Sequence, residues 1–158
     1  MADALLIAHR FDESIQQSRK TIEMDPNFAV AHYGLRQAYV QKQMYNEAIA
    51  EFQKAVELSG GDTTFISSLA CAYALSGRRD DALKLLHNVE NRSEHGVSNA
   101  PGIALVCTNL NQNDEAMNWV QKAFDERFNP SVFLRPAFDP LRSDPRFQAL
   151  MRHIGLNQ

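Results

Sequence analysis

The sequence predicts an all-α chain, a superhelix of antiparallel helix-turn-helix repeats that ends in a capping helix. Three observations predict it. A small residue recurs every 34 residues, apolar residues recur in columns at the same interval, and an amphipathic segment follows where the interval ends. Repeats of this length are helix pairs that bury their apolar faces by stacking on their neighbours.

Small side chains recur near the start of every second helix, where close packing of two helices requires them. They are Ser14, Ala48, Ala82 and Ala116. Other columns at the same spacing hold Leu35, Leu69 and Ile103; Tyr39, Tyr73 and Cys107; and Thr21, Ala55, Val89 and Ala123. These columns predict helix packing and carry no functional information.

Acidic and polar residues mark the expected helix starts, just before the small column. We expect helix N-caps at Asp12, Asn46, Asp80 and Asp114, each followed by an acidic residue suited to the positive end of the helix dipole. Polar or glycine-containing turns at 41–43, 76–78 and 109–113 separate the helices of each pair. Pro101 predicts that the first helix of the last repeat is shortened and begins near that proline.

The segment 32–39 (HYGLRQAY), followed by 45–58 (YNEAIAEFQKAVEL), closely resembles the tetratricopeptide repeat. The resemblance implies a right-handed superhelix over residues 1–128, with a partial first repeat at 1–28 and full repeats at about 29–62, 63–96 and 97–128. Arg36 departs from the pattern, which prefers a small residue there. Met1 to Arg10 supplies only about half of the helix expected before Asp12. We therefore expect an upstream repeat or domain, and an open N-terminal edge.

Residues 129–158 predict a proline-rich linker and a C-terminal capping helix. Asp139-Pro140 and Asp144-Pro145 each place an acid before a proline, which predicts two short helices. The second helix has apolar residues at helical spacing: Phe147, Leu150, Met151 and Ile154. We expect this helix to cover the last repeat. The linker residues expected to pack beneath it are Phe133, Leu134, Phe138 and Leu141. The alternative is electrostatic docking of this arginine-rich tail on the acidic body. The stretch 133–147 also resembles the ends of bacterial multidomain regulators with a C-terminal tetratricopeptide array.

Composition and motifs exclude several classes of function. The net charge of -3 and pI near 5.9 disfavour nucleic acid as a partner. We find no signal peptide or membrane span, and Cys71 and Cys107 fit no disulfide framework, so we expect a cytoplasmic protein. The histidines lack metal-ligand spacing, and no nucleophile elbow or phosphate-binding loop occurs. We expect no metal, no cofactor and no enzymatic activity.

The remaining function is binding of a protein or peptide on the concave face, which the first helix of each repeat lines. The predicted groove residues are Val30, Tyr33, Gln37, Val40, Thr64, Ser67, Cys71, Ala74, Pro101, Leu105 and Thr108. Since these side chains carry no cation, we expect a largely uncharged partner segment, with Tyr33 as the main anchor. The alternative is a structural spacer, or a dimerisation domain that pairs through the open N-terminal edge.

Overall fold

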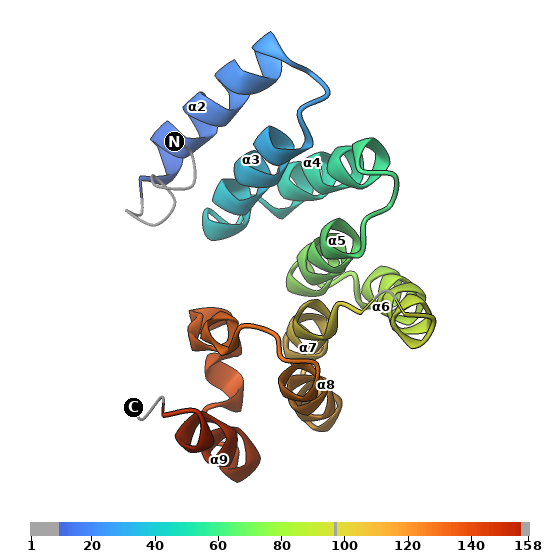
Figure 1. The fold of residues 1–158 in the computed structure, drawn as a ribbon. Coiled ribbons are helices and arrows are strands. Elements are labelled where there is room, and N and C mark those ends of the chain that lie inside the picture. Colours follow the sequence, from blue (N-terminus) through green and yellow to red (C-terminus); the bar gives the residue numbers. More distant parts are fainter. Residues whose placement is uncertain (1–9, 97, 156–158) are drawn as a thin grey trace. The chain divides into compact units, whose positions relative to one another are not determined.

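The computed structural model describes residues 10–96 and 98–155, and all regular structure in these ranges is helical (Figure 1). The helices are α2 (Phe11–Met24), α3 (Ala29–Gln41), α4 (Tyr45–Leu58), α5 (Thr63–Leu75), α6 (Arg79–Glu94), α7 (Ala100–Asn109), α8 (Asn113–Asp125), two 3-10 helices, η1 (Pro130–Leu134) and η2 (Pro136–Leu141), and α9 (Pro145–His153). The expected all-α fold of helix pairs is confirmed. The expected half-helix before Asp12, with its open edge, falls on residues 1–9, outside the described residues.

The chain divides into two compact units, Met1–Leu85 and Leu86–Gln158, which are described separately. In the first unit α2 contacts α3, α3 contacts α4 and α4 contacts α5. In the second unit α7 contacts α8, η2 contacts α7 and α9 contacts α8. Helices α3 and α4, like α7 and α8, run antiparallel as pairs (Figure 1).

The small-residue column lies in the buried core. Its four members are all fully buried: Ser14, Ala48, Ala82 and Ala116. Leu35, Leu69 and Ile103 are buried as well, and so are Ala55, Val89 and Ala123. The burial expected of these columns is therefore confirmed except at Thr21, which is only half-buried, and the buried apolar side chains stabilise the helix packing.

The turns between paired helices share one geometry. Gln43, Gly77 and Asn111, each 34 residues apart, all adopt a positive φ. The amide of Gln43 bonds to the carbonyl of Val40, and the amide of Met44 bonds to that of Tyr39. This pair of hydrogen bonds is the Schellman motif, which ends one helix and reverses the chain.

The predicted N-caps are wrong by about two residues. The residues that precede α2, α4 and α8 are Arg10, Met44 and Gln112, and none of them makes a side-chain capping bond. The acids lie inside the first turn instead, where they face the positive end of the helix dipole. The reason is the turn itself: Met44, which closes the Schellman motif, already starts the next helix.

The linker differs from its prediction in two places. Asp139-Pro140 does not begin a helix, because Pro140 lies inside η2, which starts at Pro136. Leu134 is 37% exposed and is not packed beneath the capping helix. The helix predicted after Asp144 is confirmed as α9, and Asp144 accepts a hydrogen bond from the amide of Arg146. Helix α7 is shortened, with Pro101 in its first turn, as predicted.

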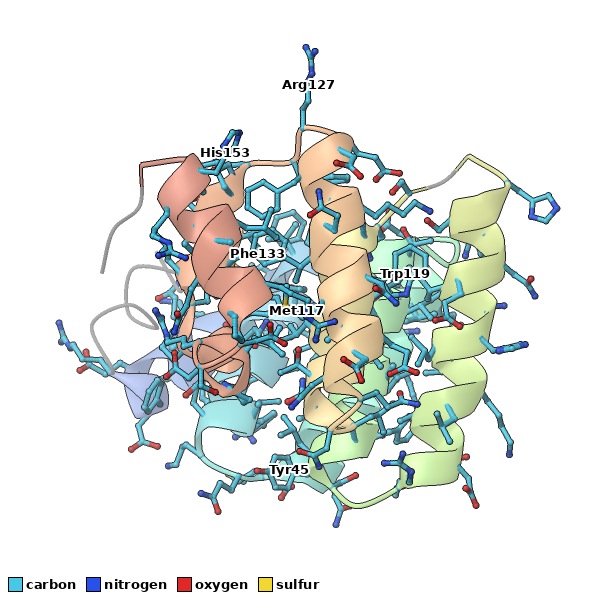
Figure 2. All side chains as sticks on the ribbon, turned by 90° about the horizontal axis from the view of Figure 1, so that it is seen from below. Tyr45, Met117, Trp119, Arg127, Phe133 and His153 are labelled. Atoms are coloured by element: carbon cyan, nitrogen blue, oxygen red, sulfur yellow. The ribbon has the colours of Figure 1, made fainter. Side chains whose placement is uncertain are left out.

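An aromatic cluster forms the core of the second unit. The ring of Phe133 stacks on Phe124, with centroids 5.6 Å apart, and meets the edge of Phe138 at 5.1 Å. Phe133 lies in the interior, whereas Arg127, just after α8, projects away from the helices (Figure 2). Aromatic pairs of this geometry stabilise a core beyond the area that they bury.

Helix α9 is held mainly by burial of its apolar face. Phe147 and Met151 are almost fully buried. The Arg146 guanidinium also bonds to the Asp114 carboxylate of α8 at 2.8 Å, but both side chains are largely exposed. An exposed ion pair contributes less than about 1 kcal/mol. The capping role predicted for this helix therefore dominates over electrostatic docking.

Candidate functional site

The predicted groove residues of α3 form one accessible strip. Val30 is 55% exposed, and Tyr33, Gln37 and Val40 are half-exposed along the same helix face. The Gln37 side-chain amide donates a hydrogen bond to the Tyr33 hydroxyl at 3.0 Å. Tyr33 thus presents a ring whose hydroxyl is already oriented, as an anchor for a bound chain requires.

Helix α5 adds fewer accessible residues than the sequence predicted. Thr64 is exposed and Ala74 is half-exposed, but Ser67 and Cys71 are buried. The expectation that Ser67 and Cys71 lie on the surface is wrong, because their side chains are small and neighbouring side chains cover them. The larger Phe65, which the sequence analysis did not select, is half-exposed instead.

In the second unit, the corresponding line on α7 is also only partly accessible. Pro101 and Leu105 are half-exposed. Thr108 is buried, and its hydroxyl donates to the Ala104 carbonyl one turn earlier at 2.8 Å. The expectation of an accessible Thr108 is therefore wrong, since its hydroxyl is used by its own helix.

Behind Tyr33 lies a buried arginine that the groove prediction left out. Arg36 follows Tyr33 by one helical turn and is 0% exposed. Its guanidinium carbon lies 3.4 Å from the centroid of the Tyr33 ring, 4.1 Å from that of Phe52 on α4 and 5.0 Å from that of Phe65 on α5. We call Arg36 with these three rings the aromatic box. Cation–π attraction to the ring faces stabilises the charge.

The guanidinium nevertheless lacks hydrogen-bond partners. Its Nε and both terminal nitrogens have none among the described residues. Burial lowers the pKa of Arg36 to about 9, because the charged form loses its hydration. That pKa still leaves the side chain charged at neutral pH. Buried polar groups are ordinarily satisfied, so an unpaired buried cation requires an explanation.

A second buried basic residue of α3 shows the ordinary arrangement. His32 is 5% exposed, and its Nδ1 lies 2.5 Å from a carboxylate oxygen of Glu51 on α4. Its Nε2 lies 3.0 Å from the Pro26 carbonyl oxygen. Both ring nitrogens therefore have acceptors, whereas Arg36 on the next turn has none among the described residues.

The sequence held a signal for the aromatic box. Arg36 occupies a column whose next members, Ala70 and Ala104, are small and fully buried. An arginine in a column of alanines fits only where its neighbours form a larger space. The three aromatic residues come from three different helices, so their convergence on Arg36 could not be read from spacing along one helix.

Other kinds of site find no support in the part of the chain that the structure describes. No group of three or more histidine, cysteine, aspartate or glutamate side chains there is arranged to hold a metal ion. No described helix combines the length and hydrophobicity needed to cross a bilayer. Cys71 and Cys107 are both buried.

Comparisons with known proteins agree with this architecture. Residues 30–62 match the tetratricopeptide repeat family. No curated protein matches the chain. One similar solved structure is that of YrrB, described as a TPR protein with an unusual peptide-binding site, at 20% identity and a TM-score of 0.56 over 99% of this chain and 76% of YrrB. Another is that of MamA, at 19% identity and a TM-score of 0.58 over 99% of this chain and 85% of MamA. At these identities, the likeness shows the fold.

Proposed function

We propose that this chain, which carries a tetratricopeptide repeat and has the tetratricopeptide-repeat fold, is a protein-interaction module that binds a peptide segment of a partner. The binding surface is the face of α3 and α5 around Tyr33. The observation that carries the proposal is the half-exposed pair of Tyr33 and Phe65, whose rings meet edge to face at 5.7 Å.

The chemistry of this face suits an extended or helical peptide with apolar anchors. Val30 and Val40 flank the two rings along α3, and Gln37 adds an amide that can exchange hydrogen bonds with a peptide backbone. Partly exposed aromatic residues within an apolar strip are the typical hot spots of protein interfaces. The description of YrrB as a TPR protein with an unusual peptide-binding site is consistent with this function.

The test is to select peptides from a random display library on the intact chain, and to measure their affinities for wild type and variants. We expect Tyr33→Ala to weaken binding by more than about 1 kcal/mol, because it removes the central ring. The matched control is Tyr45→Ala, which truncates another half-exposed tyrosine at the start of α4. Circular dichroism confirms that both variants fold.

The outcome that contradicts the proposal is equal binding by Tyr33→Ala and wild type. Binding would then have to use another face, such as the α7 residues Pro101 and Leu105. A Tyr33→Ala, Leu105→Ala double variant tests both faces at once. If it binds as wild type does, the groove hypothesis fails for both units.

The alternative function is self-association or a spacer role within a larger bacterial regulator. It rests on the resemblance of residues 133–147 to the ends of such regulators. Light scattering over a range of protein concentrations separates the two functions. A stable dimer in which Tyr33 is protected from solvent would favour self-association, whereas a monomer that binds selected peptides favours the interaction module.

A further inference from the structure

We propose that the Arg36 guanidinium is an anchor site for one glutamate side chain of the bound peptide. This inference rests on the proposed peptide-binding function and adds a charge requirement to it. The groove side chains predicted from the sequence carry no cation, and they implied an uncharged partner segment. The aromatic box changes that expectation, because it places one positive charge directly behind the Tyr33 ring.

Unpaired donors make Arg36 unlike the other buried polar groups of its helix. A guanidinium carries five N–H donors in a rigid plane, and none of its three nitrogens has a hydrogen-bond partner among the described residues. Leaving a buried charge without hydrogen bonds costs free energy in the unbound chain. A ligand that supplies acceptors removes this cost when it binds, so the site favours a ligand with paired acceptors.

The geometry of the box leaves the donors free for such a ligand. A ring centroid 3.4 Å from the guanidinium carbon lies over the flat face of the group, because an in-plane ring would overlap the nitrogens. The Tyr33 ring therefore covers a face of the group, and the buried N–H donors at its edge have no hydrogen-bond partner among the described residues. A carboxylate matches that edge with two parallel hydrogen bonds, which is the strongest pairing that arginine makes in proteins.

Access to Arg36 is through the two rings on the groove side. Phe52 is buried at 3% exposure and forms the inner wall of the box. Tyr33 and Phe65 are half-exposed and separate the guanidinium from solvent. Their edge-to-face contact holds them together by only about 1 kcal/mol. Rotation of Tyr33 opens the box and breaks the hydrogen bond from Gln37 and the cation–π contact with Arg36, so the ion pair with the ligand has to outweigh both losses.

A glutamate of the partner fits this entrance better than other sources of negative charge. Its two methylene groups form a slender apolar stem that can pass between two rings, and its carboxylate then reaches the guanidinium. A terminal carboxylate would have to bring the peptide backbone between the rings. Glu51 on α4 already pairs with His32 and makes no hydrogen bond to Arg36.

The experiment uses library-selected peptides, synthesised with blocked termini so that every carboxylate belongs to a side chain. Affinities are measured for each glutamate-containing peptide and its glutamine counterpart, against wild type and Arg36→Met. Charged hydrogen bonds predict that the glutamine peptide binds wild type at least about tenfold more weakly. Against Arg36→Met the two peptides should bind within about twofold of each other. Arg36→Lys, which keeps the charge but lacks the planar fork, should retain part of the difference.

Salt provides an independent readout, because a buried pair is screened much less than an exposed one. The glutamate preference should persist when salt is raised.

Each contrary result has a distinct meaning. Peptides that bind through Tyr33 with equal affinity for glutamate and glutamine would overturn the inference and leave the proposed function standing. An equal glutamate preference in wild type and in both Arg36 variants would also overturn the inference, because the peptide glutamate would then bind a basic residue other than Arg36. If the blocked peptides show no glutamate preference and the same peptides with free C-termini bind more tightly to wild type than to Arg36→Met, the ligand is a terminal carboxylate and the inference fails. The absence of any binder dependent on Tyr33 would overturn the proposed function and this inference together.

Discussion

One packing position holds a cation in the first unit and a methyl group in the second. Arg36 of α3 and Ala104 of α7 lie two 34-residue steps apart, and both are 0% exposed. The rings closest to Arg36 are Tyr33 and Phe52. The repeat step replaces these rings with Pro101 and Val120 in the second unit, where the residues are smaller and carry no π face.

The repeat therefore determines where this position lies in its helix, but not which type of side chain occupies it. The second unit uses its core for stability, with Phe133, Phe138 and Phe147 almost fully buried around an apolar centre. The first unit keeps in its core a cation that has no hydrogen-bond partner in the described part of the chain. Natural proteins tolerate such destabilising groups where function needs them.

The largest loss of stability is expected when the buried arginine of the first unit is introduced at the equivalent position of the second unit. Ala104→Arg places a charge among apolar side chains, with no aromatic box and no acceptor, and should cost more than about 4 kcal/mol. We expect the second unit to unfold, as measured by loss of its amide signals in NMR spectra. The matched control is Ala149→Arg at an exposed position of α9. A folded Ala104→Arg protein of near wild-type stability would show that this column tolerates cations generally.

The next effect concerns the aromatic cluster that stabilises the second unit. Phe133→Ala removes a ring that contacts both Phe124 and Phe138 and leaves a cavity. We expect a loss of about 3–5 kcal/mol in the free energy of unfolding, measured by chemical denaturation. Phe128→Ala, at a position 36% exposed, is the control and should cost below about 1 kcal/mol. Similar losses for the two variants would contradict a core centred on Phe133.

Much of this fold could be predicted because packing repeats at a constant interval. The small column from Ser14 to Ala116 was predicted to be buried, and all four of its members are fully buried. The shortened α7 and the position of α9 followed from proline chemistry at Pro101 and Pro145. The predicted helix starts were wrong because the hydrogen bonds of the preceding turn determine where each helix begins. A residue such as Met44, which precedes α4, has no side chain typical of an N-cap.

The candidate site was harder to predict, because it depends on contacts between helices. Spacing along α3 correctly placed Val30 and Tyr33 on one accessible face. The same reasoning failed for Ser67 and Thr108, whose burial is decided by neighbouring side chains. Arg36 was visible as a departure from the repeat, but only the structure shows its charge without hydrogen-bond partners among the described residues.

A smaller effect is expected at the end of the second unit. Asp144→Ala removes the carboxylate that caps α9 through the Arg146 amide at 2.8 Å, and should cost about 1 kcal/mol. Asp139→Ala tests the cap that the sequence predicted and the structure does not show. It removes only an exposed pair with Arg142 and should cost less than about 0.5 kcal/mol. Equal losses in thermal unfolding would contradict a specific capping role for Asp144.

An effect of about the same size but of opposite sign is expected from a substitution that makes the first unit resemble the second. Arg36→Met replaces the buried guanidinium with an apolar side chain of similar length. The variant loses cation–π attraction, which contributes about 2 kcal/mol when desolvated, and it escapes a desolvation cost of several kcal/mol. We therefore expect the free energy of unfolding to rise by about 1 kcal/mol, measured by denaturation in urea. A clear loss of stability would mean that the rings alone compensate the charge, and that Arg36 is a structural residue.

The pH dependence of that gain separates charge from packing. Because burial lowers the pKa of Arg36 to about 9, the folded chain releases this proton at a lower pH than the unfolded chain does. Below about pH 9 both states are protonated, so wild type bears the full desolvation cost and the gain from Arg36→Met is at its largest. Above that pH the unfolded chain binds more protons than the folded chain, which raises the stability of wild type and narrows the gain. Denaturation of both proteins at about pH 8 and at about pH 10 measures this difference, and titrations common to both cancel. If the gain in stability from Arg36→Met is the same at both pH values, the substitution acts through packing around Tyr33 and Phe52, and not through the buried charge.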